Sequence, residues 1–437
     1  MKEQASGPRA QASGLGKVSG VVSASALGPG PALRPEAWSL GPHQLWVFTL
    51  CGLCLIMDGF DVQSIGYVAP AIITDWTIAN TDMGPVFSAG LFGLFLGSLV
   101  FSMVADRIGR RPVVLGATLA FSMLTLLTAR ASSITELIAV RFLAGLGLGA
   151  ILPNATALVG EFSAPRHRIK TMMIVTNGFT IGAMIGGFLS AWLIPQYGWR
   201  SVFIVGGVIP LAILIPMWVS LPESPQFRAP VGAARRPMIA RLFADGRAFI
   251  TIVLWIVNFL NVLNAYSVSS WLPTLVRDAG YPTSTAVLVG TSVQTGGVLG
   301  TIVLGWVIQR VGFVPVLTGC FTLAAINLAL IGQPSLSVSM LFVVAFLAGL
   351  GIFAGQPGLN ALAATVYPTG IRSTGIGSGL GIGRFGAFLG PVLAGELIRR
   401  HWTTQDLFHA AAIPAALSAV AILCAGLAKR VPGGTLE

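Results

Sequence analysis

Apolar windows of about 20 residues, each long enough to cross a lipid bilayer as a helix, recur along almost the whole chain. Of its 437 residues, 54% are hydrophobic and only 9% are charged. A chain in lipid must pair its backbone N–H and C=O groups internally, and a helix does this within one segment. We therefore predict an all-α membrane protein with twelve transmembrane helices. They are expected near residues 45–69, 83–104, 112–130, 134–160, 169–194, 201–221, 248–274, 284–308, 314–333, 338–363, 373–398 and 407–428.

Positively charged residues are unevenly divided between the segments that separate these helices. Sixteen Lys and Arg residues fall on one predicted side of the membrane, and five fall on the other. Because positively charged loops stay in the cytoplasm, we predict that both termini and the 222–247 segment are cytoplasmic. The net charge of +11 does not indicate a nucleic-acid partner, because the topology already accounts for the basic residues and leaves no basic face.

The second half of the chain repeats the first at a distance of 203 or 204 residues. The run FLAGLG at Phe142–Gly147 returns at Phe346–Gly351, and Arg107 returns as Arg310. Six crossings bring the chain back to the same side, so the halves are parallel repeats. We predict two pseudo-symmetric six-helix halves, a cytoplasmic linker and two tails. Their boundaries are 43–221 and 248–430 for the halves, 222–247 for the linker, 1–42 for a disordered cytoplasmic tail and 431–437 for the C-terminal tail.

Four charged residues inside predicted helices have uncharged counterparts in the other half. They are Asp58 (opposite Asn261), Asp61 (opposite Asn264), Arg141 (opposite Ala345) and Arg384 (opposite Thr180). Each costs about 2.5–3.5 kcal/mol at mid-helix, so it must be paired, hydrated or functional. Asp58 and Asp61 share a helix face and repel each other, which favours a carboxyl group that holds a proton. We predict that they couple transport to protons; a structural ion pair with Arg141 is the alternative.

The segment between the second and third predicted helices resembles a motif of the major facilitator superfamily. Residues 102–111 read SMVADRIGRR, against the superfamily pattern G-x-x-x-D-R-x-G-R-R, and a degenerate copy lies at 305–312. Ser102 replaces the first glycine, and Gln309 stands in the second copy where an acid is expected. The resemblance implies the twelve-helix fold and a secondary transporter rather than an enzyme.

Within that superfamily, three segments spread over residues 43–430 look like the aromatic acid:proton symporter family. They are DGFD at 58–61, RFLAGLG at 141–147 and the segment 372–384. The resemblance implies import of a benzoate-, hydroxybenzoate- or phenylpropanoid-type anion with protons, by alternating access across the bacterial inner membrane. It also implies functional roles for the four unmatched charges. We expect no cofactor, since the proton gradient drives transport, and we expect a monomer.

Several side chains in the predicted helices are candidates for substrate contact. They are Arg141, Arg384, Asn261, Asn264, Gln356, Asn360 and Trp255. The two arginines are favoured because a guanidinium can form two parallel hydrogen bonds to a carboxylate. Hydrogen bonding between helices is an equal alternative for Gln356 and Asn360, and packing is the alternative for Trp255.

Charged residues near the predicted cytoplasmic helix ends indicate a gate. We predict an ion-pair network that holds this side closed, with solvated loop charges as the alternative. Its members are Asp106, Arg107, Arg110, Glu161, Arg168 and Arg372. No Cys or His spacing matches a metal site, and the sequence shows no nucleophile with a base and no phosphate-binding loop.

Two other functions stay open. A proton-coupled antiporter that exports organic compounds is less favoured, because the G-x-x-x-G-P run usual in helix five of antiporters is replaced here by Gly182–Gly187 without proline. A membrane nutrient sensor would keep the fold and bind without translocating; the lack of a long regulatory tail or soluble output domain counts against it.

Overall fold

The computed structural model describes residues 41–164, 167–224, 239–333, 336–368 and 371–427, which form helices joined by short turns. Most of the predicted tails and of the 222–247 linker lie outside these residues. The helices are α1 (Pro42–Trp76), η1 (Asn80–Asp82), α2 (Met83–Ile108), α3 (Arg110–Thr128), α4 (Ile134–Gly149), α5 (Ile151–Phe162), α6 (Arg168–Thr176), α7 (Gly178–Tyr197), α8 (Arg200–Ser220), η2 (Ile239–Phe243), α9 (Ala248–Asp278), α10 (Thr283–Val311), α11 (Phe313–Ile331), α12 (Val338–Val366), α13 (Arg372–Arg399) and α14 (Thr404–Leu427).

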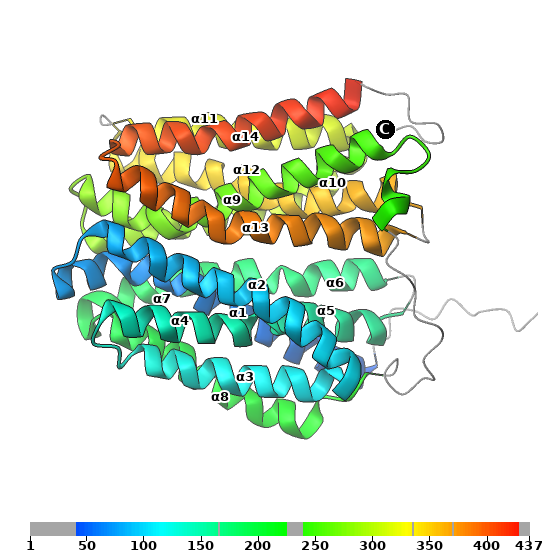
Figure 1. Cartoon of the computed structure of the whole chain (residues 1–437), viewed down its shortest axis with the longest axis horizontal. Helices are drawn as coiled ribbons and strands as arrows, with labels where there is room; N and C mark the ends of the chain where they lie inside the picture. Colours follow the sequence, from blue (N-terminus) through cyan, green and yellow to red (C-terminus); the bar gives the residue numbers. More distant parts are fainter. Residues whose placement is uncertain (1–40, 165–166, 225–238, 334–335, 369–370, 428–437) are drawn as a thin grey trace, which may run out of the picture. The chain divides into compact units, whose positions relative to one another are not determined.

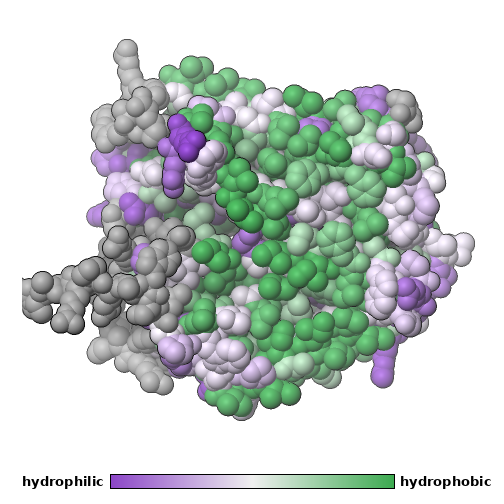
Figure 2. Space-filling model, turned by 180° about the vertical axis from the view of Figure 1, so that it is seen from behind, coloured by the Kyte–Doolittle hydropathy of each residue, from purple (hydrophilic) through white to green (hydrophobic). Residues whose placement is uncertain are grey.

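Twelve spans in the described part of the chain are long and apolar enough to cross a membrane. α4 and α5 together form one of them, and the span Thr171–Tyr197 covers most of α6 and all of α7. Figure 2 shows a broad hydrophobic region across the visible face, with hydrophilic residues gathered at its two ends. The twelve-helix prediction is confirmed.

Two helices continue past prolines near which the sequence predicted their ends. α1 runs through Pro70 to Trp76 instead of ending near residue 69, and α9 runs through Pro273 to Asp278 instead of ending near residue 274. A proline removes one backbone hydrogen bond, but ending the helix within lipid would leave several groups unpaired. Continuing the helix therefore costs less free energy than ending it.

Helix pairing is the same in both halves of the chain. In the first half α1 packs on α7, α2 on α4 and α3 on α8; in the second, α9 packs on α13, α10 on α12 and α11 on α14. Counted as spans, these are the first with the fifth, the second with the fourth and the third with the sixth. Figure 1 shows α1–α8 and α9–α14 as two groups of helices. The pseudo-symmetric six-helix arrangement is confirmed, while the residue boundaries of the halves stay predictions.

The two halves share a hydrophobic core at one end of the helix bundle. We call the end next to the 222–247 segment the linker end, and the opposite one the far end. One core cluster contains buried residues of both halves, including Ile72, Phe87 and Trp271, and lies toward the far end. Toward the linker end the buried residues form separate clusters, one within residues 47–221 and another within 242–425. The halves are therefore joined at the far end.

Polar and close backbone contacts reinforce the joined far end. The Arg277 guanidinium donates Nη1–H to the backbone oxygen of Pro70 at 2.7 Å and to Thr74 Oγ1 at 2.9 Å. A Cβ atom on Gly66 would lie 2.7 Å from the backbone oxygen of Ser269, so glycine allows α1 and α9 to approach here. These contacts hold the first and seventh spans together.

Candidate functional site

A buried ion pair joins Asp61 of α1 to Arg141 of α4. Arg141 Nη1 lies 3.0 Å from Asp61 Oδ2, and the two side chains are 3% and 0% exposed. Thr125 of α3 donates its hydroxyl to Asp61 Oδ1 at 2.7 Å, and Arg141 Nη2 donates to the backbone oxygen of Asp61 at 3.2 Å. Both carboxylate oxygens of Asp61 therefore have a partner within the first half. The structure therefore contains the ion pair of the sequence-based alternative, with Asp61 as its acid, while a role of Asp61 in proton coupling stays a prediction.

Asp58 lies one turn earlier in α1 and has a different environment. It is 1% exposed, and its Oδ1 has no hydrogen-bond partner among the described residues. Its carboxyl group interacts electrostatically with Asp61 on α1 and with Arg384 and Tyr266 of the second half. A buried carboxylate without a bonded partner is costly, and binding a proton removes its charge. Asp58 is therefore the carboxyl group here that is suited to exchange a proton.

Arg384 of α13 faces the first half. Its Nη1 donates to the hydroxyl of Ser98 on α2. Phenylalanines flank this contact, with the Phe95 and Phe385 rings 4.7 Å apart and the Phe92 and Phe388 rings 5.4 Å apart. No described carboxylate lies within ion-pair distance of Arg384, so its remaining N–H groups can bind an anion.

Two of the predicted polar side chains, Asn261 of α9 and Gln356 of α12, form a hydrogen-bonded network with Asn258. Asn261 Nδ2 donates to Gln356 Oε1 at 3.1 Å, and Gln356 Nε2 donates to Asn258 Oδ1 at 2.8 Å. Hydrogen bonding between helices therefore accounts for the contacts of Gln356. Asn360 lies one turn further along α12 and is half-buried.

Two other candidates on α9 lie outside this network. Trp255 donates its indole N–H to Ser378 Oγ at 3.0 Å, which ties α9 to α13. Asn264 is buried, and its Oδ1 has no partner in the part of the chain that the structure describes.

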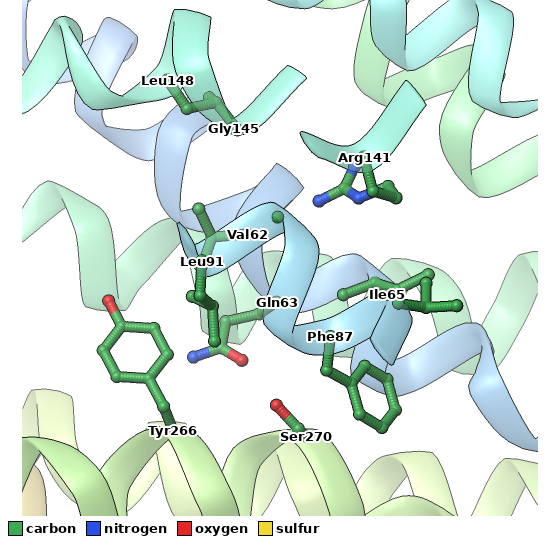
Figure 3. Close-up of a pocket in the computed structure, with 12 residues that line it drawn as sticks. Val62, Gln63, Ile65, Phe87, Leu91, Arg141, Gly145, Leu148, Tyr266 and Ser270 are labelled. Atoms are coloured by element: carbon green, nitrogen blue, oxygen red, sulfur yellow. The ribbon is translucent and has the colours of Figure 1, made fainter. Parts of the chain in front are cut away.

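A small cavity lies between the halves, beside the Asp61–Arg141 pair (Figure 3). Arg141 and Gln63 line it from the first half, and Tyr266 and Ser270 line it from the second. Its volume of about 10 Å³ is close to that needed by one water molecule. A substrate as large as a benzene ring therefore requires the halves to move. Gln63 could have been found from the sequence, because it is a polar residue within an apolar span. Tyr266 gave no such signal, because tyrosines occur in helices of many kinds.

The structure brings together two of the six predicted gate residues. Arg110 Nε lies 3.0 Å from Glu161 Oε1. The other four are Asp106, Arg107 and Arg168, which are exposed, and Arg372, which donates to the backbone oxygen of Tyr367 at 3.3 Å. The Arg110–Glu161 pair lies within the first half, so a gate between the halves stays a prediction.

Glu223 caps the start of α3, a contact that was not predicted from the sequence. Its Oε1 accepts hydrogen bonds from the backbone N–H groups of Arg110 at 2.9 Å and Arg111 at 3.2 Å, at the start of α3. A carboxylate is favourable there because the first N–H groups of a helix have no partner within it. Gly109 makes room: its φ is +102°, and a Cβ atom on it would lie 2.4 Å from Glu223 Oε2. The glycine of the DRxGRR motif thus separates α2 from α3 and admits the capping acid.

Comparisons with known proteins agree with this architecture. A family model described as the Major Facilitator Superfamily matches residues 51–391 and 254–435. The chain is 37% identical to a gallate transporter of Pseudomonas putida, covering 89% of this chain and 93% of that protein. It is 35% identical to the 4-hydroxybenzoate transporter PcaK of Pseudomonas aeruginosa, covering 91% and 96%. Among solved structures, that of a D-xylose-proton symporter superposes with a TM-score of 0.72 at 16% identity, covering 90% of this chain and 99% of that one.

The likeness extends over nearly the full length of these relatives, and the described part of the chain contains twelve candidate membrane spans. The sequence-based prediction of family and of a non-enzymatic role is therefore confirmed. The chain belongs to the Major Facilitator Superfamily and is a multi-pass membrane transporter.

Proposed function

We propose that the protein imports a small aromatic carboxylate of the benzoate, hydroxybenzoate or phenylpropanoid type together with a proton. Its relatives are named for gallate and 4-hydroxybenzoate, which are both aromatic carboxylates. A substrate of this class needs a cation for its carboxylate and apolar or aromatic surfaces for its ring. Arg384 and the phenylalanines beside it offer both.

The observation that carries the proposal is the position of Asp58, which interacts electrostatically with Arg384 but forms no ion pair among the described residues. When Asp58 is ionised, its charge competes with an incoming anion for Arg384. When Asp58 takes up a proton, that competition ends and the guanidinium can bind the substrate carboxylate through two hydrogen bonds. Proton and anion therefore bind together, as symport requires.

The neighbouring Asp61–Arg141 pair has a different role in this mechanism. Since Arg141 is already neutralised at 3.0 Å, it is not a second anion site while the pair holds. It stabilises the junction of α1 and α4.

The charge distribution and the packing of the two halves support the proposed direction of access. The positive-inside rule assigns the linker end to the cytoplasm of a bacterial inner membrane, with both termini on that side. The buried residues of the two halves form separate clusters there, which supports release of the substrate at this end. Uptake from outside requires the joined far end to separate. This is alternating access by a monomer, driven by the proton gradient without a cofactor.

Transport by the purified protein in liposomes tests this proposal. Labelled 4-hydroxybenzoate is supplied outside liposomes with an alkaline interior, and uptake into protein-free liposomes is subtracted because the neutral acid also diffuses through lipid. We expect accumulation that an uncoupler abolishes and that benzoate and gallate, but not xylose, inhibit. Binding without accumulation would identify a sensor, and accumulation only under the inverted gradient would identify an exporter.

A further inference from the structure

A second cavity lies in the second half, between α9, α13 and α14. Its volume is about 170 Å³, and its walls are mainly apolar, with Trp271, Leu275 and Phe408 among them. The indole N–H of Trp271 donates to the backbone oxygen of Pro391 at 3.1 Å, so this polar group is already used. The residues that line this cavity are different from those that line the cavity beside Arg141.

Asn264 lines this cavity and carries an unpaired polar group. Its side chain is 2% exposed and lines the cavity, and its Oδ1 has no hydrogen-bond partner among the described residues. The internal repeat explains why. Asp61, its counterpart, is paired with Arg141 and Thr125. Those two partners correspond to Ala345 and Leu328 in the second half, so the acceptor is present but both donors are missing.

The cavity chemistry defines the ligand class. A buried amide oxygen without a donor is costly, so an O–H or N–H group is required. Water is a weaker candidate because it needs two to four polar partners, and Asn264 and Ser267 supply only the minimum in a cavity whose other walls are mainly apolar. An anion is disfavoured because none of the lining residues is charged. A dry apolar cavity of about 150 Å³ is known to bind benzene, so 170 Å³ suits a single aromatic ring.

We propose that this cavity binds one neutral phenol, whose hydroxyl donates to Asn264 Oδ1 while its ring lies between α9, α13 and α14. Leu393, in the cavity wall, is 45% exposed, so the cavity lies close to the surface of the helix bundle. A lipid acyl chain has no donor and would leave Asn264 unpaired. The site is separate from Arg384 and takes uncharged ligands.

Fluorine NMR of the full-length protein in nanodiscs provides the test, with 4-fluorophenol and fluorobenzene as probes that differ in the hydroxyl group. We expect the wild type to bind 4-fluorophenol about fivefold more tightly than fluorobenzene, the effect of one net hydrogen bond. Asn264→Leu should bind both probes equally. Ala411→Phe, which fills the cavity, should weaken both, whereas Ala416→Leu, exposed on the same helix and outside the cavity wall, should change neither.

Three results would overturn the proposal. One is equal binding of the two probes by the wild type. Another is a preference for 4-fluorophenol that survives Asn264→Leu, since the hydrogen bond would then lie elsewhere. The last is loss of bound 4-fluorophenol when 4-hydroxybenzoate is added at saturating concentration, because the probe would then occupy the anion site. A resident lipid would give the first result.

Discussion

Breaking the Asp61–Arg141 pair from one side should destabilise the protein far more than removing both charges. The two atoms are 3.0 Å apart, and neither side chain is more than 3% exposed. Asp61→Asn alone leaves a buried guanidinium uncompensated, and Arg141→Met alone leaves a buried carboxylate. Each single change should cost about 3–5 kcal/mol of unfolding free energy. The double variant leaves no charge at this pair, so its cost should stay below about 1–2 kcal/mol.

The internal repeat supports the design of the double variant, because the second half carries Asn264 and Ala345 at the same positions, both buried. The assay is denaturant-induced unfolding in mixed micelles, followed by tryptophan fluorescence and extrapolated linearly. We expect the losses of unfolding free energy to be strongly non-additive, with the double variant more stable than either single variant. If the double variant instead loses the sum of the two single losses, the pair does not act as a unit and the reasoning fails.

Three further outcomes are expected. Asp58→Asn should make the affinity for 4-hydroxybenzoate independent of pH. The wild type should bind more tightly as the pH falls, because protonated Asp58 no longer competes with the substrate for Arg384. Titration calorimetry at several pH values measures this, and an unchanged pH dependence in the variant would show that Asp58 does not couple binding to protons. Arg384→Lys should weaken binding of the same acid at least tenfold, about 1.4 kcal/mol, because an ammonium cannot form two parallel hydrogen bonds; wild-type affinity in a folded Lys variant would contradict this. Gly109→Ala should lower the unfolding free energy by about 1–2 kcal/mol, since its φ is +102° and the added Cβ meets Glu223, while Gly116→Ala, with nothing within 4 Å of its Cβ, should be neutral or stabilising in the same unfolding assay.

The fold could be predicted from the sequence because lipid leaves few alternatives for a long apolar chain and because the repeat fixes the number and order of spans. The same repeat identified Asp58, Asp61, Arg141 and Arg384, since a charge without a counterpart stands out in an alignment of the halves. It could not show which acid is paired. That depends on the packing of the helices in the first half, which places Arg141 and Thr125 beside Asp61.

The contact of Glu223 with the start of α3 could not be predicted from the sequence either. It joins residues more than a hundred positions apart and depends on the positive φ of Gly109. The helix ends beyond Pro70 and Pro273 were missed for another reason. A proline ends helices in water, where the freed backbone groups can be solvated, but not within lipid.

The apolar core at the far end should make the equilibrium between the access states depend on temperature. Opening that end moves side chains such as Ile72 and Phe87, which are 0% and 1% exposed, from contact with the other half toward water. Exposing apolar surface raises the heat capacity, and the hydrophobic attraction weakens on cooling. The equilibrium between the two access states should therefore give a curved van 't Hoff plot, in which cooling favours the state open at the far end. Distances between spin labels on the 76–80 and 278–282 turns, measured over a temperature series, would record that curvature, and a straight plot would mean that little apolar surface separates during the cycle.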